Sequence, residues 1–511
     1  MASSSKHPAV INGLRILWVI LVFWYELGIF NASVRGCRWP DSYLRLKHDA
    51  QDGSLKPAHI LLVADPQIID RHSYPSRGPL LYGLTRFLVD LNLRKNWRVA
   101  LQKQPDAIVF LGDMMDNGRY AMPEEEYEEY YQRFSSIFSG AGDTPMYFIP
   151  GNHDTGFVLA AAICPTWSDS AYSLGISSQF SSEARSRYSA HFGAPNRAIS
   201  IANHTLVLFD APNYADEDSL RHGKKKSFEN WTPVQGGALE FMKEFANEQH
   251  TDPVILFSHI PLHRQDGKGC GLLREKGSIR PGVGFGYQNM LEKKSSQRLL
   301  ESFKPTAVFS GDDHDYCEYN HELLLPRGPP SMIREVTVKT LSMVMNVRKP
   351  GFQLLSLTPA DLRRDTKHTY FDTPCNLPDQ LGNYLDSYLP LLALSLLLVF
   401  VMNIHDETLP YNLKSKAEPV YDVENASPSS SGSSPGWFIL QGQRRQLHSG
   451  HTSSLDWAER MKERLSSLSS AQTSAVLRRQ SWLWASLHDV WRIAVFPICT
   501  FALITWWVLS H

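Results

Sequence analysis

The feature that most constrains this chain is a series of short apolar runs separated by longer polar stretches. Between residues 56 and 357 the runs cover residues 59–64, 107–111, 146–149, 205–209, 254–257 and 307–309. Runs of this length without polar alternation are typical of strands buried on both faces of a sheet. The stretches 84–101 and 239–248 are compatible with helices between such strands. The sequence therefore predicts an α/β fold.

Side chains that can bind metal ions follow five of these runs. They are Asp65 and Gln67, then Asp113 and Asp116, then Asn152, His153 and Asp154, then His259, and finally Asp312, Asp313, His314 and Asp315. In open α/β sheets, sites form beyond the carboxyl ends of the strands. A single acid at a strand end is usually a turn residue or a helix cap. Five such ends in succession indicate one shared pocket, whose mixture of ligands suits manganese, iron or zinc.

The order of these motifs resembles the calcineurin-like metallophosphoesterase superfamily. The family pattern is Asp-x-His, Gly-Asp-x-x-Asp, Gly-Asn-His-Asp/Glu, a lone His and Gly-His-x-His, and the resemblance covers residues 56–357. It implies a two-sheet α/β sandwich with flanking helices and two divalent metal ions at the strand ends. It also implies that Asp113 bridges both metals. The remaining ligands would be Asp65, Gln67 and His314 at the first metal, and Asn152, His259 and Asp312 at the second.

Two positions depart from the family pattern. Gln67 stands where the family usually has histidine, and Asp312 replaces the first histidine of Gly-His-x-His. An amide oxygen is a weaker ligand than an imidazole, and a carboxylate is a harder one. Both changes favour manganese or magnesium over zinc. Whether Gln67 binds metal directly stays open.

The resemblance also assigns catalytic roles. His153 resembles the general acid that protonates the leaving alkoxide, and Asp116 resembles the acid that orients this histidine. Arg119 is a candidate for binding a phosphate oxygen, with a structural ion pair as the alternative. His263 is a weaker substrate-binding candidate, with a surface-loop histidine as the alternative. Asp154, Asp313 and Asp315 are candidates for supporting the ligands or for hydrogen bonding within loops, and Asp210 is a weaker candidate still.

Three apolar segments predict membrane helices at both ends of the chain. We divide the chain into an N-terminal anchor at 1–31, a catalytic domain at 56–357, a transmembrane helix at 387–404, a cytosolic and partly disordered linker at 405–489, and a second transmembrane helix at 490–509. The first segment is short for a span, so a signal peptide is the alternative. No small-residue cleavage site follows it, which favours an uncleaved anchor.

Flanking charge predicts the orientation. The linker is rich in Lys and Arg, which places it in the cytosol and the catalytic domain in the lumen. The glycosylation acceptors Asn31, Asn203 and Asn230 agree with this, whereas Asn425 and the basic residues that follow the first span do not. Cys37 and Cys375 each lie near an apolar segment and would pair if that region is lumenal, with unrelated thiols as the alternative.

A narrower resemblance suggests the substrate. The membrane segments, Ala-Asp-Pro-Gln and Ser-Gly-Asp-Asp-His-Asp-Tyr-Cys are similar to the fungal cell-division-control type of phosphoesterase and to the animal enzymes that remodel glycosylphosphatidylinositol (GPI) anchors. This group implies a manganese-dependent phosphodiesterase of the endoplasmic reticulum or Golgi membrane that removes ethanolamine phosphate from mannose of a GPI-linked lipid or protein. The alternatives are a membrane-bound phosphomonoesterase or protein phosphatase, and a non-catalytic manganese-homeostasis protein. A net charge of −1 argues against nucleic acid as a partner.

Overall fold

The computed structural model of the chain describes residues 6–43, 56–156, 183–284, 287–323, 330–359, 369–414 and 454–510. Its contacts define two units. One consists of Met1–Val19 and Tyr388–Cys499, and the other of Ile20–Ser387 and Thr500–His511. Residues 415–453 of the expected linker, including the acceptor Asn425, lie outside the described residues.

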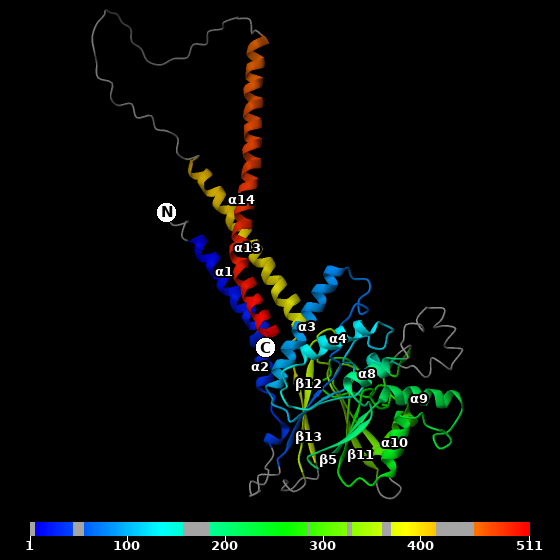
Figure 1. Cartoon of the computed structure of the whole chain (residues 1–511). Coiled ribbons are helices and arrows are strands. Elements are labelled where there is room, and N and C mark those ends of the chain that lie inside the picture. Colours follow the sequence, from blue (N-terminus) through cyan, green and yellow to red (C-terminus); the bar gives the residue numbers. More distant parts are fainter. Residues whose placement is uncertain are drawn as a thin grey trace, which may run out of the picture. The chain divides into compact units, whose positions relative to one another are not determined.

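Two sheets form the centre of the larger unit (Figure 1). The first has the order β13-β12-β1-β2-β3, in which β1 to β3 are parallel and β12 and β13 are antiparallel to their neighbours. The strands are β1 (Ala58–Val63), β2 (Ala107–Phe110), β3 (Met146–Phe148), β12 (Gly351–Leu357) and β13 (Tyr370–Asn376). This sheet continues beyond residue 357, where the apolar pattern of the sequence ends.

The second sheet has the order β10-β11-β9-β6-β5-β4, and a separate hairpin pairs β7 (Val283–Gly284) with β8 (Tyr287–Gln288). Strands β5, β6, β9 and β11 run parallel, with antiparallel strands at both edges. The strands are β4 (Arg197–Ile201), β5 (His204–Phe209), β6 (Val254–Ser258), β9 (Ala307–Ser310), β10 (Cys317–Leu323) and β11 (Ser331–Thr337). All six strands expected from apolar runs are therefore present in the two sheets.

Alternating side chains on these strands build three cores. In β1, Ile60 and Leu62 belong to a core made by both sheets, whereas Leu61 and Val63 pack with the helices on the outer face of the first sheet. A third core joins the second sheet to its own helices. The result is the two-sheet α/β sandwich with flanking helices that the resemblance implied.

Helices cover the outer faces of both sheets (Figure 1). The first sheet is covered by α3 (Pro79–Leu101), α4 (Glu124–Ile137) and α8 (Ala184–Phe192), and the second by α9 (Ala211–Gly223), α10 (Ala238–Asn247) and α11 (Lys293–Phe303). The short helix α5 (Asn152–Thr155) follows β3. The expected helices at 84–101 and 239–248 correspond to α3 and α10.

Three helices are long and apolar enough to cross a membrane. They span His7–Arg35, Gln380–His405 and Trp482–Ser510. The first comprises α1 (Lys6–Phe23), a π-helical turn (Trp24–Gly28) and α2 (Ile29–Arg35). The second includes α12 (Gln380–Gly382), another π-helical turn (Asn383–Tyr388) and α13 (Leu389–Lys414). The third is the end of α14 (Ser454–Ser510). Candidate membrane helices thus lie at both ends of the chain. Residues 454–489, which the sequence assigned to the linker, are helical.

Two disulfide bonds lie in the larger unit. Cys37 pairs with Cys375 across 338 residues, and Cys270 pairs with Cys317. The first is the pairing that the sequence left open. Among the described residues Cys499 is free and exposed.

Candidate metal centre

The carboxyl ends of β1, β2, β3, β6 and β9 meet at one edge of the sandwich. Asp65 follows β1, Asp113 follows β2, Asn152 begins α5 after β3, and His259 follows β6. The loop after β9 carries Asp312 and His314. These ends come from both sheets, so the site forms only when the two sheets pack together.

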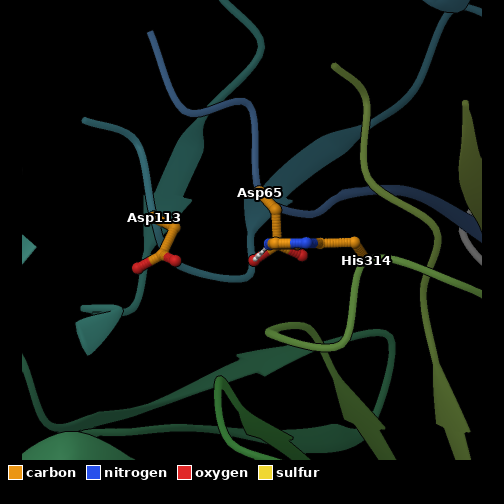
Figure 2. A group of neighbouring side chains, drawn as sticks. All are labelled: Asp65, Asp113 and His314. Carbon is orange, nitrogen blue, oxygen red and sulfur yellow. Dashed lines mark ion pairs between the residues drawn. The ribbon is translucent and has the colours of Figure 1, made fainter. Parts of the chain in front are cut away.

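Two groups of side chains within this edge have the spacing that a metal ion needs. One group is Asp65, Asp113 and His314, and the other is Asp113, His259 and Asp312; the ligand atoms of each group lie within 4.8 Å of one another. Asp113 belongs to both groups, as expected for a bridging carboxylate. Figure 2 shows the first group, in which the imidazole of His314 faces the carboxylate of Asp65, with Nε2 and Oδ1 4.0 Å apart.

A hydrogen bond on the side of the ring away from the other ligands of the second metal fixes the orientation of His259. Its Nδ1 lies 2.7 Å from the carbonyl oxygen of Leu111. A carbonyl oxygen can only accept, so Nδ1 donates to it and Nε2 is the ring nitrogen that faces the other ligands and would bind a metal. That Nε2 lies 3.1 Å from Oδ1 of Asn152, 3.4 Å from Oδ1 of Asp113 and 3.6 Å from Oδ1 of Asp312. All four candidate ligands of the second metal therefore meet around one point.

Gln67 also lies in the centre of the site. Its side chain is buried, and Nε2 donates to Oδ2 of Asp113 at 2.8 Å. In this arrangement the amide holds the shared carboxylate in place through its nitrogen.

The backbone of the site is held in an unfavourable conformation. Asp65, Gln67, Asp113, Asp312 and His314 all have φ between 39° and 67°. Non-glycine residues rarely adopt this left-handed region, and each instance costs on the order of 1 kcal/mol or more. Five of them within one set of loops indicate that the fold maintains the geometry of the loops for function rather than for stability.

Two glycines permit the close approach of these loops. A Cβ on Gly151 would lie 2.0 Å from Oδ1 of Asp113, and one on Gly112, where φ is +95°, would lie 2.4 Å from Nδ1 of His259. The glycines of the Gly-Asp and Gly-Asn motifs are therefore required by the packing of one ligand against the backbone of another.

The electrostatics of the site favour a bound cation. Burial, together with the charges of Asp113 and Asp312, raises the pKa of Asp65 well above its usual range, against the effect of His259. Burial acts in the same direction on Asp113, but the neighbouring His259 and His153 hold the pKa of Asp113 far below its usual range. Oδ2 of Asp65 is buried and has no hydrogen-bond partner in the described part of the chain. Several buried carboxylates and an orphaned oxygen fit divalent metal ions, which would balance the charge and complete the coordination.

His153 adjoins the ligands without belonging to either metal group. Its backbone N–H donates to Oδ1 of Asp113 at 2.9 Å. Its Nδ1 donates to the carbonyl oxygen of Asp116 and lies 3.4 Å from that residue's Oδ1. Burial acts to lower the pKa of His153, but the charge of Asp113 and the hydrogen bond to Asp116 outweigh burial and raise it. The remaining nitrogen, Nε2, is therefore the one available for proton transfer.

Arg119 lies beside this histidine. Its Nη1 donates to the carbonyl oxygen of Asn152 at 3.3 Å, and its backbone N–H donates to the carbonyl oxygen of His153 at 3.0 Å. These contacts place a positive charge at the rim of the site, next to two of the motif residues.

Asp154 organises the loops that carry the ligands. Its carboxylate accepts hydrogen bonds from the backbone N–H groups of Asp113, Met115 and Gly151 at 2.8 to 3.1 Å. Burial and the nearby Asp113 raise the pKa of Asp154 to about 7. Asp154 thus forms hydrogen bonds to the backbone of these loops, which is one of the two roles that the sequence left open for it.

Asp313 and Asp315 connect the loop that contains His314 to the neighbouring segment 270–276. Asp313 pairs with Arg274, and Asp315 accepts from the backbone N–H groups of Glu275 and Lys276 at 2.8 Å. The Cys270–Cys317 disulfide joins the same two segments. Residues 270–276 were not recognised from the sequence, because nothing in their pattern points to the site except a cysteine whose partner the sequence does not identify.

Two residues that the sequence suggested for the site, His263 and Asp210, contact residues other than the metal ligands. The backbone N–H of His263 donates to Ser296, and burial together with Lys293 and His321 lowers the pKa of its imidazole. Asp210 caps α9 by accepting from the N–H of Asn213 at 2.9 Å and pairs with Arg185. Asp210 therefore has the role of a helix cap, and substrate binding by His263 stays a prediction.

Comparison with known proteins places this geometry in a family. The model of the calcineurin-like phosphoesterase family matches residues 58–316. Cell division control protein 1 of Saccharomyces cerevisiae is 32% identical over 71% of this chain and 68% of its own length. Metallophosphoesterase 1 of Gallus gallus is 25% identical over 67% of this chain and 79% of its own, and that of Cricetulus griseus is 26% identical over 78% and 90%. The buried carboxylate–histidine cluster is the feature that such a family requires for hydrolysis, and the chain accordingly belongs to the calcineurin-like phosphoesterases as a metal-dependent phosphoesterase.

Proposed function

We propose that this protein is a phosphodiesterase that removes ethanolamine phosphate from a mannose of GPI anchors in the early secretory pathway. The hydrolytic part rests on one observation, the convergence of two ligand groups on a shared Asp113. The substrate rests on the resemblance of the Ala-Asp-Pro-Gln and Ser-Gly-Asp-Asp-His-Asp-Tyr-Cys motifs to enzymes that remodel GPI anchors.

The ligand assignment follows from the two groups. Asp65 and His314 would hold one cation, His259, Asp312 and the neighbouring Asn152 would hold the other, and Asp113 would contribute to both. Gln67 donates to Asp113 through Nε2 in this structure, and we propose it as a further ligand of the first cation through its amide oxygen. When bound, two divalent ions supply Lewis acidity at the phosphoryl oxygens and lower the pKa of water to give a nucleophile. The mainly oxygen ligand set, with only two imidazoles, favours manganese.

The protein's own groups perform the remaining steps. His153 acts as the general acid: with Nδ1 bonded to Asp116, it delivers the proton on Nε2 to the leaving mannose alkoxide. Arg119 supplies positive charge for a phosphate oxygen. Asp116 keeps the imidazole in one orientation, so that the proton is on the correct nitrogen.

The cellular location is proposed from three features. The candidate spans hold the catalytic domain at a bilayer, where lipid-linked substrates are concentrated. Two disulfides in the larger unit are typical of an oxidising compartment. The basic segment at 405–489 favours the cytosolic side, which leaves the domain in the lumen of the endoplasmic reticulum or Golgi.

The decisive experiment is glycan analysis of GPI lipids from cells that lack the protein. We expect ethanolamine phosphate to persist on one mannose, to disappear when the wild-type chain is restored, and to persist with Asp113→Asn. Unchanged GPI glycans would refute the substrate but not the phosphoesterase chemistry. Manganese-dependent hydrolysis of a simple phosphodiester by the purified full chain tests that chemistry separately, and activity on phosphomonoesters alone would favour the phosphomonoesterase alternative.

A further inference from the structure

The first half of α3 exposes a row of large apolar side chains. Leu80 is 90% exposed, Leu81 56%, Leu84 54% and Phe87 38%. Leu80, Leu84 and Phe87 follow the i, i+4, i+7 spacing that places residues on one face of a helix. From Val89 onward α3 is largely buried in the core of the catalytic domain. The helix therefore has a packed second half and an apolar first half that projects from the fold.

The contacts of the second half give the direction in which α3 points. Lys95 forms a buried ion pair with Glu26, Gln102 donates to Asn31, and Lys103 donates to the carbonyl oxygens of Val34 and Cys37. Residue numbers rise together along both partners, so over these contacts α3 runs in the same sense as the end of the first candidate span. From Lys95 back to Leu80, α3 is roughly 22 Å long. Over this length it points towards the side of the domain on which the first candidate span enters the membrane.

The apolar face of α3 is continuous with a contact to another candidate span. Arg98 lies 18 residues after Leu80, which is five helical turns and hence the same face. Its guanidinium stacks over the ring of Trp507 at 3.9 Å from the ring centroid. Trp507 lies near the end of the span Trp482–Ser510, where aromatic side chains mark the membrane–water interface. One face of α3 therefore runs from the contact with Trp507 to the exposed leucines.

Basic groups accompany the apolar face. Arg77 precedes the helix and donates to Thr85, and Arg86 lies on another face of the same turns, where it is partly exposed. An apolar face flanked by arginines is the pattern of a helix that rests in the headgroup region of a bilayer. Because this face of α3 continues to the end of a candidate span, a bilayer explains its position better than a protein partner does.

We propose that the first two turns of α3 dock into the surface of the same bilayer that the candidate spans cross. The docked helix fixes the position of the metal centre relative to the lipids. The chain from Gln67 to Pro79 joins the ligands to α3, and within it Asp70 accepts a hydrogen bond from Asn117 at 3.0 Å, next to Asp116. Docking thus holds the loops of the site beside the headgroups and presents a lipid-linked phosphoester to them.

The proposal is tested directly by measuring the depth of a spin label. The full chain carrying Cys164→Ser, Cys499→Ser and Leu84→Cys is labelled with a nitroxide and placed in nanodiscs that contain anionic lipid. We expect oxygen, which partitions into lipid, to relax the label more strongly than a water-soluble nickel chelate does. The control Met332→Cys, at a residue 56% exposed on β11, should show the reverse. A label at position 84 that is open to the nickel chelate, or shielded from both agents, overturns the proposal.

A second arm measures function and rests on the proposed phosphodiesterase activity. The variant Leu80→Ser/Leu84→Ser/Phe87→Ser should lose roughly tenfold or more in kcat/KM on a phosphodiester lipid in vesicles, because apolar contact with the bilayer is lost. Its kcat/KM on soluble bis(p-nitrophenyl) phosphate should stay unchanged, as should both activities of Met332→Ser. Equal activity of variant and wild type on the vesicles overturns the docking role. If both activities fall, the substitutions disturb the metal centre, and the spin-label result decides.

Discussion

Asp113 and His153 belong to different sequence motifs, lie 40 residues apart in the chain and are joined by one hydrogen bond, yet they have different assignments. The carboxylate of Asp113 belongs to both ligand groups, whereas the imidazole of His153 belongs to neither. Substitution can therefore separate metal binding from proton transfer at two residues that are in direct contact.

At the residue scale, we predict that Asp113→Asn loses metal and activity together. His153→Ala should retain metal while kcat falls roughly 10²–10⁴-fold, the usual contribution of a general acid. Metal content by elemental analysis and kcat on a phosphodiester are the measurements. Full activity in either variant would contradict the assigned role, and Asp143→Asn, at a residue exposed in the loop before β3, serves as the neutral control.

A second residue-scale prediction concerns Gly151. Because a Cβ at this position would lie 2.0 Å from Oδ1 of Asp113, Gly151→Ala must displace the shared carboxylate. We expect a large loss of metal affinity in a protein that still folds, measured by titration of the metal-free chain with Mn²⁺. Gly193→Ala does not serve as a control because φ there is +89°, whereas Gly277→Ala does, since no atom lies within 4 Å of the added methyl group. Wild-type affinity in Gly151→Ala would show that the loops are not packed as described.

At the element scale, a buried network fixes the segment that follows β6. Glu335 on β11 accepts from the N–H of Leu262 at 3.1 Å and from Ser310 at 2.7 Å, and it pairs with Arg264 at 3.2 Å and His321 at 2.7 Å. The network connects β11, β9 and β10 to the loop that begins with His259. It therefore stabilises the second sheet where that sheet contributes a ligand.

This network predicts a specific sensitivity to acid. Burial acts to raise the pKa of Glu335, but Arg264 and His321 outweigh burial and lower it to about 2, compared with 4.5 in the unfolded chain. Its contribution is thus complete above about pH 4.5 and is lost as the pH falls towards 2; at neutral pH it is about 3 kcal/mol. Glu335→Gln should reduce the unfolding free energy at neutral pH and flatten this acid-dependent loss, as measured by denaturant unfolding at several pH values. Glu322→Gln, at an exposed residue of β10, should behave as wild type. An identical pH dependence in Glu335→Gln and wild type would exclude the proposed contribution.

The elements also show which parts of the fold a single sequence reveals. Strands β1, β2 and β9 were predictable because each is a short run of apolar residues buried on both faces. Strand β10 at the edge of its sheet, with the sequence CEYNHEL, and the neighbouring β11, with SMIREVT, were not, because strands of mixed apolar and polar residues lack that signal. The ligands were predictable from the strand ends, whereas the carbonyl of Leu111 and the carboxylate of Glu335 act through contacts between distant segments, which no local pattern records.

At the scale of the whole molecule, N-linked glycosylation tests the proposed lumenal orientation of the catalytic domain. Asn203 lies in the exposed turn between β4 and β5, and Asn230 is exposed after α9. If the domain is lumenal, we expect both acceptors to carry N-linked glycans, so that an N-glycosidase increases the mobility of the protein on a gel. The variant Asn31→Gln/Asn203→Gln/Asn230→Gln, which removes every acceptor assigned to the lumen, should lose this shift. Glycan at Asn425 instead would place the 405–489 segment in the lumen and reverse the proposed orientation.

The Cys37–Cys375 bond encloses almost the whole catalytic domain in a covalent loop, and each of the two cysteines lies next to a candidate membrane span in the sequence. A single proteolytic cut in any exposed segment inside this loop would leave both fragments attached to each other and to the bilayer. Release of the domain from its membrane would then require two cuts or reduction of the bond. A nicked protein should migrate as one band without reductant and as two bands with it, so the bond makes the anchorage of the enzyme tolerant of proteolytic damage.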